Sequence, residues 1–278
     1  MALYFRHDRI YRKFMSSLPS LNYRPVVKAG ANAAAASARL GGNSDDPETL
    51  NQKVNLRSRI KKLPHQGIWR ALNDLSRELV CLARHVRACR DARKYADAKA
   101  LKLHVGCGSN PKTGWVNVDC SAHADLQLDL REPIRLPDGC AQVIYSEHFL
   151  EHLNYPEDAK RFLSESFRVL EPGGTFSVGV PDAGIALLSY ASAPDRRHAE
   201  PDPWHPEWCK TYMEHINFFF RQGFDHRFVY DFETMEQALK EAGFAEIRQR
   251  GFDPDIDSKK WEFGTLYVNA VKPITESL

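Results

Sequence analysis

The stretch "LHVGCGSNPKTGWVNVDC", residues 103–120, decides how the fold is interpreted. A predicted strand runs into the turn Gly106-Cys107-Gly108, and the acidic Asp119 ends the next predicted strand. In an open α/β sheet, a glycine turn and an acid at neighbouring strand ends face the same ligand site. A full helix normally separates two such elements, but only ten residues lie between Gly108 and Asp119. The stretch therefore predicts a nucleotide-type cofactor site with a shortened connection.

The glycines and acids narrow the choice of cofactor. Glycine at positions 106 and 108 removes Cβ atoms that would block the approach of a ligand to the backbone. The third glycine of the dinucleotide fingerprint is replaced by Pro111, which disfavours an NAD pyrophosphate resting on a helix N-terminus. Asp119 is suited to accept both ribose hydroxyls, and Asp129, at the end of "ADLQLDL", an adenine amino group. The alternative interpretation is that the two glycines form only a tight turn and that Asp119 and Asp129 are loop carboxylates that bind no ligand.

Strands and helical patterns alternate after residue 100, which predicts an α/β fold with a mostly parallel sheet and helices on both faces. The predicted helices span about 157–170 and 233–242, and the predicted strands are 101–105, 116–118, 125–128, 142–146, 174–180 and the late "TLYVNAVK". The segment 191–225 fits neither period. We expect it to be an insertion of the 101–278 domain that covers the end of the sheet, with candidate wall residues Trp204, His205 and Trp208.

The first 100 residues form a basic segment of two parts. They carry 20 Lys and Arg against 8 Asp and Glu, whereas the rest of the chain is acidic, so the halves either attract each other or leave a basic arm. Residues 1–65 are of low complexity and are expected to be a disordered basic tail, with a transit peptide as the alternative. Residues 66–100 predict an amphipathic basic helix. It would pack on the next domain, pair with another subunit or contact an anionic membrane surface through Trp69, Leu72, Leu75, Leu79, Leu82 and Val86.

Composition bounds the class of protein. A chain of 278 residues with 43% hydrophobic and 27% charged residues suits a globular protein, and no apolar stretch reaches the roughly 18 to 20 residues of a membrane span. The start of the sequence shows no apolar signal-peptide core. None of the six cysteines forms a CxxC pair, so neither a disulfide framework nor structural zinc is expected. We therefore expect the protein to lie in a reducing compartment, the cytoplasm. The oligomeric state is not indicated.

Five segments carry a family resemblance: "LKLHVGCGSNPKTGWVNVDC", "ADLQLDL", "GCAQVIYSEHFLEHL", "FLSESFRVLEPGGTFSVGVPD" and "HRFVYDFETMEQALKEAGF". In this order, over residues 101–272, they resemble class I S-adenosylmethionine-dependent methyltransferases, most closely the short-loop, type-11 group. The resemblance implies a Rossmann-like seven-stranded sheet with its last strand antiparallel, and S-adenosylmethionine as the cofactor. It implies that Gly106 and Gly108 face the methionine part, Asp119 the ribose and Asp129 the adenine. The expected cofactor-binding set also includes Cys107 and Glu147.

The segment "SEHFLEHL" contains the pattern H-x-x-E-H at His148, Glu151 and His152. The inverted zinc-protease motif has this form, but it needs a long helix, which Tyr155-Pro156 would break. By the resemblance, some methyltransferases carry E-x-x-E-H here and hold a divalent ion against a substrate hydroxyl. His148 in place of the first Glu disfavours magnesium, which prefers oxygen ligands, so no metal is expected.

Histidines are the expected catalytic residues. A histidine near its ordinary pKa of about 6.5 is a suitable general base at neutral pH. His148 and His152 follow the strand at 142–146, and His226 lies in "HRFVYD", a segment whose histidine faces the site by the resemblance. The structural alternatives are a buried hydrogen-bonding role for the first two and a loop anchor for His226.

The resemblance implies methyl transfer to a hydroxyl of a sugar, a glycan or another small polar acceptor. Such a transfer mainly needs an aligned acceptor and the exclusion of water. Two alternatives stay open: a non-catalytic binding protein of the same fold, suggested by the shortened loop, and a nucleic-acid methyltransferase, suggested by the basic first 100 residues. Nucleic acid is the less favoured partner, because the catalytic part is acidic and lacks interleaved aromatic and basic residues.

Overall fold

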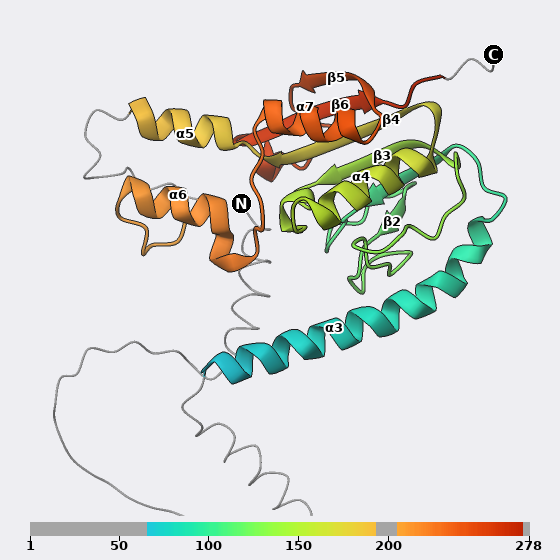
Figure 1. Ribbon diagram of the computed structural model, residues 1–278, viewed down its shortest axis with the longest axis horizontal. Helices are drawn as coiled ribbons and strands as arrows, with labels where there is room; N and C mark the ends of the chain where they lie inside the picture. Colours follow the sequence, from blue (N-terminus) through green and yellow to red (C-terminus); the bar gives the residue numbers. More distant parts are fainter. Residues whose placement is uncertain (1–65, 193–204, 275–278) are drawn as a thin grey trace, which may run out of the picture. The chain divides into compact units, whose positions relative to one another are not determined.

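The computed structural model describes residues 66–192 and 205–274 (Figure 1). The chain divides into two compact units, and the boundary falls within a helix, between Arg77 and Glu78. The predictions for residues 1–65 and for Trp204 lie outside the described residues.

One sheet organises the larger unit. Its strands, in the described residues, are β1 (Leu101–Val105), β2 (Val116–Val118), β3 (Ala141–Glu147), β4 (Leu170–Pro181), β5 (Ala245–Arg250) and β6 (Thr265–Val271). The strand order is β2-β1-β3-β4-β6-β5; β6 runs antiparallel to both of its neighbours, and the other pairs are parallel. The predicted mostly parallel sheet with an antiparallel last strand is confirmed. Its parallel part places the carboxyl ends of β1, β2 and β3 at one edge, where ligands bind in such sheets.

The strand predicted at 125–128 is reduced to a single parallel bridge between Val118 and Leu126. The backbone N–H of Leu126 donates to the carbonyl of Asn117 at 3.1 Å, as a strand residue would. The N–H of Leu128, however, donates back to the carbonyl of Leu126 at 2.9 Å, which closes a three-residue turn. This turn directs the chain away from β2, so the sheet has six strands in the described residues rather than seven.

The α-helices of the described residues are α3 (Gln66–Asp91), α4 (Glu157–Val169), α5 (Ala183–Ser192), α6 (Tyr212–Arg221) and α7 (Phe232–Glu241). α4 and α7 confirm the two helices predicted in the 101–278 domain. α5 and α6 were not predicted. α6 starts with a capping box, in which the Thr211 hydroxyl accepts from the N–H of Glu214 and the Glu214 carboxylate accepts from the N–H of Thr211.

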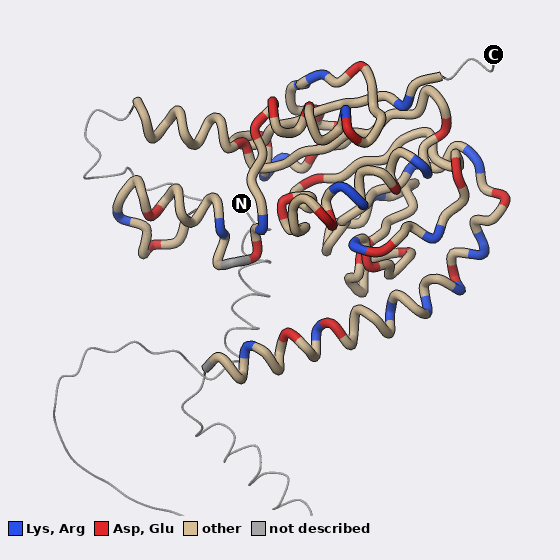
Figure 2. The backbone as a smooth tube through the Cα atoms, viewed as in Figure 1, with Lys and Arg blue, Asp and Glu red and all other residues tan. Residues whose placement is uncertain are grey.

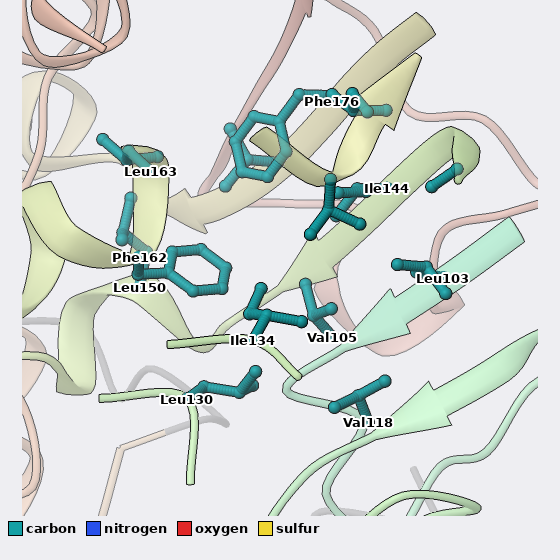
Figure 3. Close-up of a cluster of buried hydrophobic side chains, with 14 of the residues drawn as sticks. Leu103, Val105, Val118, Leu130, Ile134, Ile144, Leu150, Phe162, Leu163 and Phe176 are labelled. Atoms are coloured by element: carbon teal, nitrogen blue, oxygen red, sulfur yellow. The ribbon is translucent and has the colours of Figure 1, made fainter. Parts of the chain in front are cut away.

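The apolar core lies between the sheet and α4 (Figure 3). Leu103, Val105 and Ile144, from β1 and β3, point to this side and are fully buried. They meet Phe162 and Leu163 of α4, which repeat at helical spacing and are also buried. Burial of each such side chain stabilises the fold by roughly 1.5 to 3 kcal/mol, and this packing fixes the strand ends that carry the site.

The opposite side of β1 and β3 is polar and is covered by loops. His104 and Tyr145 alternate with the core residues and are buried there. The Tyr145 hydroxyl donates to Oδ1 of Asp257 at 3.0 Å, so the loop between β5 and β6 reaches over these strands. The prediction of helices on both faces does not hold over β1 and β3, because the connection after Gly108 is too short to form one.

The part of α3 that belongs to the larger unit packs through a face other than the predicted one. His85 and Ala88 are buried, whereas three residues of the expected apolar stripe are about half exposed: Leu79, Leu82 and Val86. Basic residues recur along the helix (Figure 2). It ends at Asp91 and continues as a short helix, η1 (Ala92–Tyr95). None of the described helices combines the length and the apolar character needed to span a membrane.

Candidate functional site

A cavity of about 270 Å³ lies at the edge where β1, β2 and β3 end. Asp119 lines it from the end of β2, and Asp129 lines it from the segment beyond. Phe149 and His152, which follow β3, form part of the same wall. The volume is just below the usual range for small-molecule sites, roughly 300 to 1,000 Å³. Three of the predicted site residues therefore share one cavity.

The two glycines of the turn after β1 are required for different reasons. Their φ angles are +72° at Gly106 and +53° at Gly108, a region that glycine adopts without steric cost. A Cβ atom on Gly106 would overlap the side chain of Phe149, whereas a Cβ atom on Gly108 would meet nothing within 4 Å. The space that we expected a ligand to use is open at Gly108, but at Gly106 the close neighbour is Phe149.

Asp119 holds this turn in place. Its Oδ2 accepts from the N–H of Gly108 at 3.0 Å, and its Oδ1 accepts from the N–H of Ser121 at 2.6 Å. The Ser121 hydroxyl donates in turn to the carbonyl of Gly108 at 2.6 Å. Each carboxylate oxygen keeps a further lone pair, so Asp119 is able to support the turn and to accept from ligand hydroxyls at the same time.

Asp129 binds Arg131 as well as lining the cavity. The Arg131 guanidinium donates to both carboxylate oxygens, with Nη2 at 2.7 Å from Oδ2 and Nε at 2.9 Å from Oδ1, and it also binds Glu78. Burial alone would raise the pKa of Asp129, but the hydrogen bonds from Arg131 outweigh it and lower the pKa. Asp129 is therefore a charged acceptor that is already partly engaged, and its contact with adenine stays a prediction.

Cys107 and Glu147 are not among the residues that line this cavity. Burial, followed by the charge of Asp119, raises the pKa of the Cys107 thiol to about 12, so the thiol stays protonated. Glu147 accepts from the N–H of Ser258 at 3.0 Å and from the hydroxyl of Tyr267 at 3.3 Å. These bonds tie β3 to the loop before β6 and to β6 itself, and the cofactor contacts of both Cys107 and Glu147 stay predictions.

The three predicted histidines gather around the carboxylate of Glu151, which is 1% exposed. Its Oε1 lies 3.3 Å from Nδ1 of His148 and 3.9 Å from Nε2 of His152. One ligand atom each of Glu151, His152 and His226 lies within 4.8 Å of the other two. Burial would raise the pKa of Glu151, but the histidines, His148 foremost, lower it, so the buried carboxylate is charged.

Backbone carbonyls fix the protons of two of these histidines. Nδ1 of His152 lies 3.0 Å from the carbonyl oxygen of Asp225, and Nδ1 of His226 lies 3.0 Å from that of Phe219. Because a carbonyl only accepts, each Nδ1 carries a proton, and each neutral ring keeps its lone pair on Nε2. Burial lowers the pKa of His226 to about 4, so that ring is neutral at pH 7. A carboxylate and imidazole lone pairs thus converge, an arrangement that favours uptake of a proton or a cation.

His148 is engaged at both ring nitrogens. Its Nδ1 faces Glu151, its Nε2 lies 2.9 Å from the hydroxyl oxygen of Thr265, and its ring stacks on Trp261 at a centroid distance of 4.1 Å. These contacts suit the structural alternative, in which His148 positions Glu151. The H-x-x-E-H pattern ends in the short helix η2 (Leu150–His152), and the next helix begins only at Glu157. The long helix of a zinc protease is therefore missing at this motif, as predicted.

A disulfide between Cys81 and Cys120, which the sequence analysis did not predict, forms part of the cavity wall. The Cα atoms are 5.8 Å apart, which is within the usual range. The bond joins α3 to the residue after Asp119. Spacing along the chain gave no signal of this pair, because the contact depends on where α3 packs. The expectation of a reducing compartment rested on the cysteine spacing, and this disulfide removes that support.

The candidate wall residues of the insertion lie apart from this cavity. His205 and Trp208 contact the ring of Phe218 in α6, at centroid distances of 5.1 Å and 6.0 Å, and neither lines the cavity. Sequence reasoning missed several residues that do, among them Phe149 and Arg131. A basic residue two positions after a strand-end acid was a usable signal for Arg131, whereas nothing in the sequence pointed to Phe149.

The chain resembles known proteins in its family and in its fold. A family model described as "Methyltransferase domain" matches residues 103–178, which run from β1 into β4. The matched stretch contains the glycine turn, both cavity carboxylates and the H-x-x-E-H pattern. No curated protein matched the chain.

Solved structures with a similar arrangement of helices and strands have low sequence identity to this chain. An S-adenosylmethionine-dependent methyltransferase from Methanosarcina mazei is 14% identical over 66% of this chain and 96% of its own, with a TM-score of 0.40. One from Mesorhizobium loti is 18% identical over 63% and 91%, with a TM-score of 0.39. A Haemonchus contortus phosphoethanolamine N-methyltransferase is 13% identical over 64% and 49%, with a TM-score of 0.38. At these identities and TM-scores, the likenesses carry no argument about the acceptor.

Proposed function

We propose that this chain, whose residues 103–178 form a class I S-adenosylmethionine-dependent methyltransferase domain, methylates a hydroxyl of a sugar or another small polar acceptor. The type of domain and its cofactor were predicted from the sequence and are confirmed by the family match. The acceptor class and the roles of individual residues are the proposed part. The observation that carries them is His152, a candidate general base in the wall of the cavity that Asp119 and Asp129 line.

The residues around the cavity fit the adenosine part of the cofactor. S-adenosylmethionine, when bound, supplies a methyl group that is activated on a sulfonium. Asp119 offers its remaining lone pairs to the ribose hydroxyls, and the buried side chains of Leu128 and Leu130 offer apolar surface to the adenine. The open space beside Gly108 leaves the backbone accessible. Because no pyrophosphate has to rest on a helix N-terminus, the missing helix is no obstacle to binding.

We assign the role of general base to His152. Its Nδ1–H is held by the carbonyl of Asp225, so its Nε2 is the nitrogen that takes the proton of an acceptor hydroxyl. The positive charge that then forms on the ring is stabilised by the buried carboxylate of Glu151, 3.9 Å away. With 36% of its side chain exposed, His152 is reachable by an acceptor from solvent, whereas Glu151 is not. The neutral His226 is placed to accept a second hydrogen bond from the acceptor.

The same side chains support a second route to an activated hydroxyl. Two imidazole lone pairs and one carboxylate within 4.8 Å of one another are a donor set suited to zinc or iron. A divalent ion held by Glu151, His152 and His226 would take over the activation that we assign to the histidine. The metal content of the wild type compared with that of His226→Gln distinguishes the two routes.

The test measures release of S-adenosylhomocysteine by the full chain against a panel of sugars, glycosides and small hydroxy compounds, with short RNA and DNA strands as further acceptors. In His152→Gln we expect turnover to fall by roughly 10² to 10⁴-fold, the contribution typical of a general base, with the affinity for S-adenosylmethionine nearly unchanged. His123→Gln, at an exposed histidine outside the cavity, is the matched control and should keep wild-type turnover.

Each contrary outcome overturns a defined part of the proposal. Full turnover in His152→Gln removes the base from the mechanism. Turnover that a chelator abolishes and a divalent ion restores, together with loss of one bound metal equivalent in His226→Gln, assigns the three side chains to a metal instead. Turnover with nucleic acid alone replaces the acceptor class. Absence of cofactor binding in the wild type, measured by calorimetry, favours the non-catalytic binding protein.

A further inference from the structure

A second cluster of metal-ligand side chains lies at the start of α6, outside the cavity. His205, Cys209 and His215 each offer one ligand atom, and these atoms lie within 4.8 Å of one another. Cys209 and His215 are buried, at 6% and 9% exposure, and His205 is half-buried. The three residues fall within eleven positions of the chain, so a short segment brings them together.

The backbone around these residues is fixed by local hydrogen bonds. The N–H of Cys209 donates to the carbonyl of Pro206 at 2.9 Å, which closes a turn between the first two ligand residues. The capping box of Thr211 and Glu214 sets the start of α6 between the second and the third. The N–H of His215 donates to the carbonyl of Thr211 at 3.1 Å, within the first turn of that helix. The fold therefore holds the three side chains close together before any ion binds.

The two imidazoles face each other through the same kind of nitrogen. Nδ1 of His205 is in close contact with Nδ1 of His215, and the rings stack with their centroids 4.6 Å apart. Two neutral rings that meet in this way share one proton at most, because a second proton would repel the first. A metal ion that accepts both lone pairs removes this conflict. Cys209 then supplies a thiolate on the same side.

We propose that His205, Cys209 and His215 bind one zinc ion. Two imidazoles and a thiolate are the borderline-soft donor set that zinc prefers, and its usual Zn–N and Zn–S distances of about 2.0 and 2.3 Å place tetrahedral ligands roughly 3.5 Å apart. Small side-chain movements bring the present atoms to that spacing. The three residues leave one coordination position, which a water molecule fills. Binding releases the thiol proton of Cys209, so the affinity falls as the pH is lowered.

The zinc ion would tie the start of α6 to the preceding loop, and α6 in turn supports His226. α6 packs on α5 and on the short helix η3 (Gln222–Phe224) that follows it (Figure 1). A small element of this kind gains stability when a metal ties its start to the preceding loop. The carbonyl of Phe219, in the same helix, holds Nδ1 of His226 at 3.0 Å. The zinc ion therefore affects the position of His226 through the one turn of α6 that joins His215 to Phe219.

Cobalt(II) substitution of the purified full chain tests the site, because a thiolate ligand produces a near-ultraviolet charge-transfer band that a site made of carboxylate and histidine lacks. We expect this band, and about one equivalent of bound zinc by elemental analysis, in the wild type. Both should be lost in Cys209→Ser and in His215→Gln. Both should persist in Cys89→Ser, which removes a half-buried thiol elsewhere, and in His226→Gln, which alters the catalytic cluster.

Three results would overturn the proposal: no charge-transfer band in the folded wild type, a band that survives Cys209→Ser, or metal that is lost only in His226→Gln. A measurement on the wild type covers the case in which a variant fails to fold. Zinc should slow alkylation of Cys209 by tenfold or more, as followed by peptide mass spectrometry, and a chelator should reverse this protection. Alkylation of Cys209 at the same rate with and without zinc would contradict the site.

Discussion

The carboxylate of Asp119 accepts a hydrogen bond from the backbone N–H of Gly108 at 3.0 Å, which joins the end of β2 to the turn after β1. Its other oxygen binds the N–H of Ser121, and the Ser121 hydroxyl returns to the carbonyl of Gly108. In a longer connection, a helix would satisfy the backbone groups that follow such a turn. Here one acid and one serine do so, which explains how the shortened connection keeps a defined turn beside the cavity.

Asp119→Asn should weaken binding of S-adenosylmethionine by tenfold or more, about 1.4 kcal/mol, and should lower the melting temperature. The amide retains one acceptor oxygen and turns a donor toward one of the two backbone N–H groups that the carboxylate satisfies. It also loses the charge that strengthens hydrogen bonds from ribose hydroxyls. Calorimetric titration and thermal unfolding measure the two effects separately.

Ser121→Ala is the matched control for this prediction. It removes the bond to the carbonyl of Gly108 and leaves the Asp119 carboxylate in place. We expect a loss of stability with a much smaller change in affinity. Equal loss of affinity in the two variants would contradict a direct contact between Asp119 and the ribose, since Asp119 would then act only by supporting the turn.

The sequence predicted the parts of the site that depend on position along the chain. Asp119 and Asp129 were placed at strand ends by the alternation of strands and turns, and the structure brings both to one cavity. Pro111 and the short connection correctly indicated that no helix follows Gly108. The capping box of Thr211 and Glu214 was a readable signal for α6, but the surrounding aromatic residues obscured its helical period.

Contacts between distant segments were beyond the reach of sequence patterns. Arg250 and Asp257 form a buried ion pair, with Nη1 2.6 Å from Oδ2, and Asp257 also accepts from the hydroxyl of Tyr145 in β3. Neither the partner of Arg250 nor the face that the loop covers follows from local periodicity. The Cys81–Cys120 bond and the packing of Phe149 over Gly106 depend in the same way on how separate elements dock.

Reduction of the Cys81–Cys120 disulfide should destabilise the protein and weaken cofactor binding. The bond closes a loop across 39 positions, and loss of such a cross-link typically costs roughly 2 to 4 kcal/mol. Because Cys120 follows Asp119 and both cysteines line the cavity, the change also reaches the site. Thermal unfolding and titration of S-adenosylmethionine, with and without a phosphine reductant, measure the two effects.

A double variant, Cys81→Ser with Cys120→Ser, serves as the control for the reductant. Its melting temperature should match that of the reduced wild type and should not respond to reductant. The denatured, unreduced wild type should expose four thiols of its six cysteines. Six reactive thiols in that measurement would show that the bond is not formed.

Acidification should destabilise the fold well above the pH at which carboxylates titrate. Burial, reinforced by the charge of Lys112, lowers the pKa of His104 from 6.5 to about 4, and burial lowers that of His226 to about 4. Between pH 6.5 and about 4, the two histidines bind protons in the unfolded chain but not in the folded chain. The stabilising contribution of the two neutral rings is therefore complete above pH 6.5 and is lost as the pH falls toward 4.

Urea denaturation at pH 7.5, 6 and 5 measures this loss as a falling free energy of unfolding. The carboxylates of Glu151 and Asp129, whose pKa values are lowered, lose their contribution only as the pH falls below about 4, so they add little in this window. In His104→Gln the baseline stability is lower, because the Asn117 partner of the ring is disturbed, but the dependence on pH should be shallower by about one proton. A slope in His104→Gln as steep as that of the wild type would show that another group governs the acid transition.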